Sequence, residues 1–311
     1  MKRLILFSLL GLSALAADAD FNGRWNIHVQ APRGRVWWLE VRGAGSGKIE
    51  GGFVGAPGGQ LDALQDARIE NGQLIFTFKR KGPPALVQTY KVSALGGKLQ
   101  GVREEAVAGK ETTTLPFTGV AAPEIRDHDD GSWHAGRKVA LFDGKTTSNW
   151  RQIVAGAPGW YVEDGLLKNR QRASDIASQE KFWNFEARFE YRYGKGSNSG
   201  VGLRGRYEIQ IYDNFGKAPD MHGSGALYSR IPPRVNASKA PGEWQTMVIR
   251  LVGRDLTVTL NGTVVIDHQT VAGPTAITTD PDEDKPGPFV LQGDHGQVEF
   301  RTAEVTELVK R

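Results

Sequence analysis

The segment from Ser197 to Gly216, SNSGVGLRGRYEIQIYDNFG, carries the residue types best suited to chemistry. If it forms one strand, its side chains alternate between two faces, because successive residues of a strand point to opposite sides of the sheet. The apolar face would hold Leu203, Tyr207, Ile209 and Ile211. The polar face would hold Arg204, Arg206, Glu208, Gln210 and Tyr212. Such a row of donors, acceptors and aromatic surface is suited to binding a sugar.

The composition favours an all-β protein that has no disulfides and relies on its core. The chain has 311 residues, enough for two domains, with 39 glycines, 8 tryptophans and no cysteine. Gly-rich turns between aromatic segments are typical of β proteins, and the absence of cysteine excludes disulfides. The formal net charge of +4 is small, and the basic residues form neither a block nor a stripe, which argues against nucleic-acid binding.

The N-terminus has the pattern of a secretory signal peptide. Lys2 and Arg3 precede the apolar run Leu4 to Leu15, and Ala14-Leu15-Ala16 forms a small-x-small cleavage site. We assign residues 1–17 to this signal and expect the mature protein to begin near Ala17 or Asp18. The run is short for a membrane span, and no second apolar stretch is long enough. The predicted location is the periplasm or the medium.

Residues 18–120 are predicted to form a small all-β domain. Alternating segments such as Arg24 to Val29 and Leu86 to Val92 are separated by Gly-rich turns, a spacing typical of a meander that closes into a barrel or a sandwich. Trp37 and Trp38 would present one indole to each face of a strand. One is expected in the core, and the other at an interface or against a sugar.

Residues 121–137 are predicted to be a linker, and residues 138–311 a second all-β domain. The linker contains Pro123 and the charged run 126–130. The second domain offers strand candidates at Phe185 to Arg192, Val201 to Tyr212 and Trp244 to Val252, among others. Asn261-Gly262 is a strong signal for a two-residue hairpin turn. A two-sheet jelly roll accommodates this many strands.

Ordered motifs in the second domain resemble one family. They are Leu141-Phe-Asp-Gly-Lys145, Trp160-Tyr-Val-Glu-Asp-Gly165, Asn198-Ser-Gly-Val-Gly-Leu-Arg204, Tyr207-Glu-Ile-Gln-Ile211, Gly225-Ala-Leu-Tyr228, Leu260-Asn-Gly262, Leu291-Gln-Gly-Asp-His295 and Val298-Glu-Phe-Arg301. This region is similar to the 3-keto-glucoside 1,2-lyase / 3-keto-2-hydroxyglucal hydratase family, also called 3-keto-disaccharide hydrolases. The resemblance implies a concanavalin-like jelly roll, similar to family 16 glycosidases.

The resemblance also implies a reaction. A separate sugar 3-dehydrogenase oxidises the C3 hydroxyl, so that the C2 hydrogen becomes acidic. A protein base removes that hydrogen, the group on C1 is eliminated, and water adds to the resulting glucal. Such an enzyme needs a base near C2, a donor at the C3 oxygen and an acid at the leaving oxygen.

Three residues are expected to act in catalysis. Arg204 could clamp an enolate or hydroxyl oxygen, with an ion pair to Glu208 as the structural alternative. Glu208 could be the base, a metal ligand or that ion-pair partner. His295 is suited to move protons near neutral pH, and its alternative role is to cap a turn.

Four further residues are expected to bind substrate. Gln210 could donate to and accept from sugar hydroxyls, or bond across strands. Tyr228 could stack on a sugar or simply pack. Gln292 matches the family's Leu-Gln-x-His pattern, although two residues separate it from His295 here. Asp213 lies at the start of a Gly-rich loop that could form the rim of the binding site. His222 on the same loop is expected to be exposed to solvent.

Other functions remain open at this point. The spacing Glu208-Ile-Gln210-Ile-Tyr212-Asp213 overlays the family 16 pattern Glu-x-Asp-x-x-Glu, but Gln replaces the middle Asp and Asp replaces the last Glu. This departure weakens ordinary retaining hydrolysis. A non-catalytic carbohydrate-binding module and a conventional endo-glucanase are the alternatives. The sequence assigns no cofactor, but Glu208, Asp213 and His295 could converge on a divalent metal ion.

Overall fold

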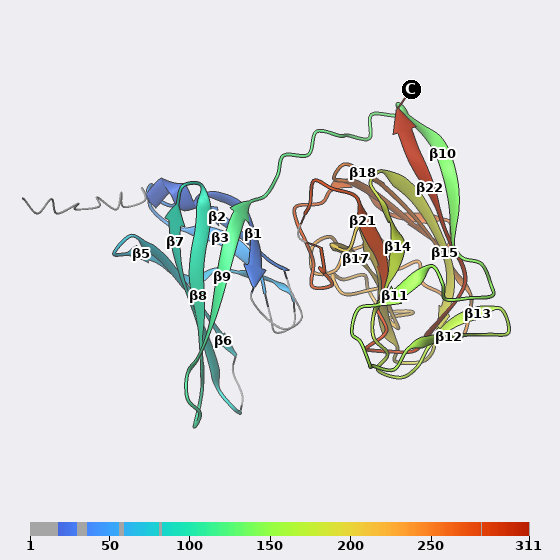
Figure 1. Cartoon of the computed structure of the whole chain (residues 1–311), viewed down its shortest axis with the longest axis horizontal. Coiled ribbons are helices and arrows are strands. Elements are labelled where there is room, and N and C mark those ends of the chain that lie inside the picture. The colour runs from blue at the N-terminus through green and yellow to red at the C-terminus, as the bar shows by residue number, and fades with distance from the viewer. Residues whose placement is uncertain (1–17, 30–35, 56–58, 81–82, 281, 311) are drawn as a thin grey trace, which may run out of the picture.

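The computed structural model describes residues 18–29, 36–55, 59–80, 83–280 and 282–310. The predicted signal peptide lies outside these residues. Two β domains follow one another along the chain, joined by an extended segment (Figure 1). The expected all-β fold, with a jelly roll after a smaller β domain, is confirmed. Among the described residues, no helix is long and apolar enough to cross a membrane.

A 3-10 turn, η1 (Asp18–Phe21), precedes a nine-stranded antiparallel sheet. In sheet order its strands are β4 (Leu61–Ala63), β3 (Glu50–Val54), β2 (Val36–Arg42), β1 (Gly23–Val29), β9 (Thr113–Ala121), β8 (Lys98–Val107), β7 (Leu86–Leu95), β6 (Gln73–Arg80) and β5 (Gln65–Glu70). Only Leu64 separates β4 from β5, so the two ends of this order are continuous in the chain. The sheet therefore closes on itself as a barrel.

Aromatic side chains fill the barrel. Trp37, Phe53, Phe76 and Tyr90 are buried, and the rings of Phe53 and Tyr90 each contact the other three, with their own ring centres 4.7 Å apart. Trp37 belongs to this core, whereas Trp38 points out of the barrel and is nevertheless only 1% exposed. Something other than the barrel must therefore cover Trp38.

The second domain has two sheets. The larger one contains β12 (Trp160–Glu163), β13 (Leu166–Asn169), β22 (Val298–Lys310), β15 (Phe185–Tyr193), β18 (Gln245–Val252), β19 (Asp255–Leu260) and β20 (Thr263–Thr270), with β10 (Trp133–Phe142) also paired to β22. The smaller one contains, in order, β11 (Trp150–Gln152), β14 (Ile176–Phe182), β21 (Gly287–Leu291), β16 (Asn198–Leu203) and β17 (Tyr207–Tyr212).

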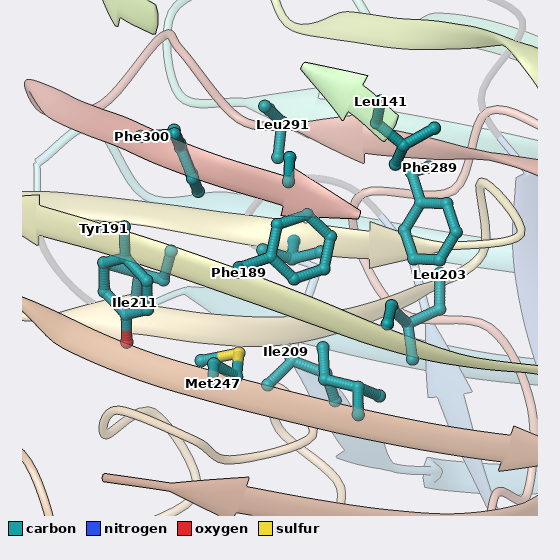
Figure 2. Close-up of a cluster of buried hydrophobic side chains, with 14 of the residues drawn as sticks. Leu141, Phe189, Tyr191, Leu203, Ile209, Ile211, Met247, Phe289, Leu291 and Phe300 are labelled. Atoms are coloured by element: carbon teal, nitrogen blue, oxygen red, sulfur yellow. The ribbon is translucent and has the colours of Figure 1, made fainter. Parts of the chain in front are cut away.

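The two sheets pack face to face over one apolar core. Ile209 and Ile211 of the smaller sheet meet Phe189 and Met247 of the larger one, and Phe289 joins them (Figure 2). Each of these side chains is fully buried. Since side chains alternate along β17, the residues between the core residues must lie on the outer face of the smaller sheet.

Two sequence predictions need correction. The segment from Val201 to Tyr212 is not one strand but a hairpin, in which β16 and β17 pair and residues 204–206 form the turn. The predicted linker extends to residue 137, whereas β10 already begins at Trp133 and pairs with the last strand. The predicted Asn261-Gly262 turn is confirmed, with φ values of 51° and 82°.

Candidate active site

The outer face of β17 presents Glu208 and Gln210, as the alternation of residues 207–212 predicts. Tyr207, Ile209 and Ile211 belong to the core, whereas Glu208 and Gln210 lie on the opposite face and are only 3% and 2% exposed. Neighbouring segments cover this face. The backbone N–H of Tyr228 donates to the carbonyl of Glu208 at 3.0 Å, and the N–H of Glu208 donates to Thr275 Oγ1 at 2.9 Å.

Glu208 is the most perturbed acid on this face. Its carboxyl leans over Gly200 of β16, where a side chain would place a Cβ only 2.4 Å from Oε1. Burial, reinforced by the charge of Asp175, raises the pKa of Glu208 to about 8, while His295 opposes the shift. A carboxyl with such a pKa exchanges protons near neutral pH. Titratable groups with this property are concentrated at active sites.

Asp175 is a second acid of the site that the sequence did not indicate. It directly precedes β14, and its Oδ1 accepts a hydrogen bond from the N–H of Gly293 at 2.8 Å. Burial is the main cause that raises the pKa of Asp175 to about 6. Asp175 and Glu208 are thus two buried acids with different pKa values, and the charge of Asp175 contributes to the raised pKa of Glu208. Two carboxyls that differ in this way can take different roles in a reaction. No local motif surrounds Asp175, so only the pairing of β14 with β21 brings it to the site.

His295 lies on the loop that follows β21 and is half-exposed. Its Nδ1 is bonded to the carboxylate of Asp294, which is the largest cause of a raised His295 pKa, and Glu208 and Asp175 raise it further. The side chain of Asn169 fixes this loop through three hydrogen bonds to its backbone. Its Nδ2 donates to the carbonyls of Gly293 (3.0 Å) and Gly296 (2.7 Å), and its Oδ1 accepts from the N–H of Val298 (2.8 Å).

Three buried polar atoms on neighbouring segments have no hydrogen-bond partner among the described residues. Gln210 Nε2 donates to Asn198 Oδ1 at 3.1 Å, but Gln210 Oε1, Gln292 Oε1 and His222 Nε2 are without a partner in this part of the chain. The His222 ring lies 5.0 Å from that of Tyr228. Burial, and then the charge of Glu208, raises the pKa of Tyr228, so Tyr228 stays a neutral phenol. Buried polar groups usually have partners, so these unpaired atoms are suited to a hydroxyl-rich ligand.

Arg204 does not join this site, contrary to the prediction. It lies in the β16–β17 turn with φ +52°, and its guanidinium is fully buried over the ring of Trp183, 3.9 Å from the ring centre. Its Nε and Nη1 donate to the carbonyls of Trp183 and Gly253, both at 2.7 Å. The predicted face was wrong because the turn at residues 204–206 breaks the alternation.

Asp213 is also directed elsewhere. Its Oδ2 accepts a hydrogen bond from the N–H of Gly196 at 2.7 Å, beyond the end of β17. In the described part of the chain, no group of three or more Asp, Glu or His side chains is arranged to hold a metal ion. The structure therefore brings Glu208 and His295 together without Asp213.

Comparison with known proteins identifies the family. Residues 137–306, more than half of the chain, match the family model described as the 3-keto-alpha-glucoside-1,2-lyase-like domain. The chain belongs to this family, as its ordered motifs predicted.

Individual proteins in the comparison share less than 30% sequence identity with this chain. A 3-keto-disaccharide hydrolase of Bacteroides thetaiotaomicron is 27% identical over 191 residues, which cover 49% of this chain and 65% of that protein. The match thus spans less than two thirds of the relative's length. Two structures of Parabacteroides distasonis proteins assigned as glycosyl hydrolases are also similar. One has 28% identity and a TM-score of 0.49, covering 60% of this chain and 92% of the other. The second has 19% identity and a TM-score of 0.46, covering 55% and 94%.

Proposed function

We propose that this protein cleaves 3-keto-glycosides by elimination and rehydration, with Glu208 as the base. The observation that carries the proposal is the buried Glu208 carboxyl, whose pKa is raised to about 8 beside Asp175 and His295 on the outer face of the smaller sheet. Family membership supports the substrate class. A base for a carbon acid must be strong but available near neutral pH, and this carboxyl meets both needs.

In the first half-reaction, the Glu208 carboxylate takes the C2 proton of the 3-keto sugar, and the electron pair moves onto the C3 oxygen. The C3 carbonyl then re-forms, a double bond forms between C1 and C2, and the C1–O bond breaks. His295, in its protonated form, gives a proton to the departing oxygen. Tyr228, a neutral phenol close enough to feel the charge of Glu208, is positioned to donate a hydrogen bond to the C3 oxygen.

In the second half-reaction, water adds to the glucal. The water oxygen bonds to C1, its proton passes to the now neutral His295, and Glu208 returns a proton to C2. The net change is hydrolysis of the glycosidic bond. Gln210 and Gln292 bind sugar hydroxyls through their unpaired Oε1 atoms.

One observation favours a second candidate. Asp175 and Glu208 are two coupled carboxyls with different pKa values, which is also the equipment of a conventional glycoside hydrolase. In that reaction one carboxyl protonates the leaving oxygen and the other attacks or activates water, and no C3 ketone is needed. The C2 hydrogen would stay in place throughout.

The substrate and its C2 hydrogen distinguish the two functions. We expect turnover of a 3-keto-disaccharide but not of its parent disaccharide, with loss of a C2 deuterium label to solvent. The Glu208→Gln variant should lose about 10²-fold or more in kcat. Cleavage of the parent sugar with the label retained would establish the conventional hydrolase, and binding without turnover would establish a carbohydrate-binding module.

The proposal also has a cellular side. Since the substrate must already carry a C3 ketone, we propose that a separate sugar 3-dehydrogenase supplies it. We further propose export to the periplasm or the medium, on the basis of the charged and apolar pattern of residues 1–17. Cell fractionation with the native N-terminus, compared with a Lys2/Arg3 double substitution, tests export.

A further inference from the structure

The N-terminal barrel contacts the second domain beside Tyr228. The backbone N–H of Leu61 donates to Ser229 Oγ at 2.9 Å. The guanidinium of Arg230 covers the outward-facing Trp38 ring, with its Cζ 4.3 Å from the ring centre. Arg230 in turn donates through Nη2 to the carbonyl of Pro274 at 2.6 Å. Trp38 is thus covered by the second domain, and the segment that carries Tyr228 is held against the barrel.

A second contact between the two domains is made by Asn26 and Glu283. Asn26, the cross-strand partner of Trp38, donates through Nδ2 to Glu283 Oε2 at 2.9 Å. The other oxygen of Glu283 accepts from Tyr207 and from Arg254, both at 2.9 Å. Glu283 is 1% exposed, so each donor matters to this buried carboxylate. Tyr207 is the residue immediately before Glu208.

The segment after β20 joins the two contacts. It contains Gly273, which lies against the Trp38 indole so closely that a Cβ there would be 2.3 Å from Nε1. It also contains Thr275, whose hydroxyl accepts the N–H of Glu208. Barrel residues therefore contact both segments that flank Glu208, at Ser229 and Arg230 on one side and at Gly273 and Glu283 on the other.

We propose that the barrel is a positioning element of the active site, which fixes Tyr228 and the Glu208 backbone through Trp38 and Asn26. This inference rests on the proposed function, because it assigns the barrel a part in that reaction. The linker supports it. Asp127 Oδ2 accepts from Trp183 Nε1 and Asn184 Nδ2, both at 2.8 Å, and Asp129 forms two bonds to Arg250. The chain between the domains is thus fixed to the jelly roll and does not act as a loose tether.

Point variants of the full-length protein test this role. Trp38→Ala and Asn26→Ala remove the two contacts, Trp38→Phe keeps an aromatic ring under Arg230, and Trp37→Phe perturbs the barrel interior next to the same position. We expect hydrogen exchange of residues 227–231, 273–280 and 282–283 to rise about tenfold in the two alanine variants. We expect kcat on the 3-keto substrate to fall about tenfold with a smaller change in KM. Trp38→Phe and Trp37→Phe should resemble the parent in both measurements.

A readout independent of turnover separates this inference from the proposed function. The carbon NMR titration of the Glu208 carboxyl, assigned by its loss in Glu208→Gln, should move toward that of an ordinary carboxyl in Trp38→Ala and Asn26→Ala, because loosened segments admit water. If the wild-type protein turns over no keto sugar, the proposed function fails, and exchange and titration still decide whether the barrel positions Glu208. Unchanged exchange and titration in folded alanine variants would overturn the inference, as would raised exchange with undiminished kcat.

Discussion

At the scale of single residues, Glu208 illustrates an active-site group that lowers the stability of the fold. Its carboxyl is buried over Gly200, and no cation that would compensate its charge is hydrogen-bonded to it in the described structure. The same burial that raises its pKa makes the ionised form costly. Functional groups in such positions often reduce stability, because the group serves the reaction and not the packing.

A pH-dependent stability difference follows for Glu208→Gln. Burial raises the folded pKa from 4.5 to about 8, so between these values the folded protein keeps a proton that the unfolded chain releases. The contribution of Glu208 to the stability of the wild type must therefore fall as pH rises from 4.5 through 8, at about 1.4 kcal/mol per pH unit. In urea unfolding, the free energy of unfolding of the variant should rise relative to that of the wild type by several kcal/mol across this pH interval. The difference should stay constant above pH 8. A constant difference from pH 4 to 9 would contradict the assigned shift.

Arg204 gives the opposite case, a polar residue that serves the fold. Its guanidinium is bonded to Trp183, Gly253 and Asn184 and lies over an indole. We expect Arg204→Lys to cost about 3 kcal/mol in urea unfolding, since an ammonium cannot replace these bonds. Measured where the variant is folded, kcat and KM should stay near their wild-type values. A large loss of kcat in the folded variant would return Arg204 to the catalytic site.

At the scale of elements, the loop after β21 depends on a side chain from another strand. Asn169 of β13 makes three hydrogen bonds to the backbone of residues 293–298 and so fixes the position of His295. We expect Asn169→Ala to lower kcat about tenfold or more, because small displacements of a proton donor are costly. Gln245→Ala is a matched control, since Gln245 is equally buried and braces Lys239, away from the site. Equal activity loss in both variants would indicate a general effect on the fold.

The elements also show which features a sequence can predict. Residues 207–212 alternate as expected, because each core position needs only its own side chain to be apolar. The turn at residues 204–206 was missed, because two arginines beside Gly205 look like the continuation of a polar face, yet both are fully buried. Asp175 was missed for a different reason. Its place near Glu208 depends on strand pairing across more than a hundred residues, which periodicity does not encode.

At the scale of the whole molecule, the barrel and the jelly roll share a buried polar network. Glu283 accepts hydrogen bonds from Asn26 of the barrel and from Tyr207 and Arg254 of the jelly roll. The sequence predicted two β domains, but not this network, because Asn26 and Glu283 are 257 residues apart. Two domains that share buried, mutually dependent hydrogen bonds should unfold together.

The Glu283→Ala variant tests this coupling. It leaves the buried Arg254 cation without its carboxylate and removes the acceptor of Asn26 and Tyr207, a change that typically costs about 3–5 kcal/mol. We expect the wild type to unfold in a single calorimetric transition and the variant to show two, with the first at lower temperature. Asp282→Ala is the control, because the Asp282 carboxylate is exposed and pairs only with Lys285 among the ion pairs of the described chain. A single transition in Glu283→Ala, merely shifted, would mean that contacts other than this network couple the domains.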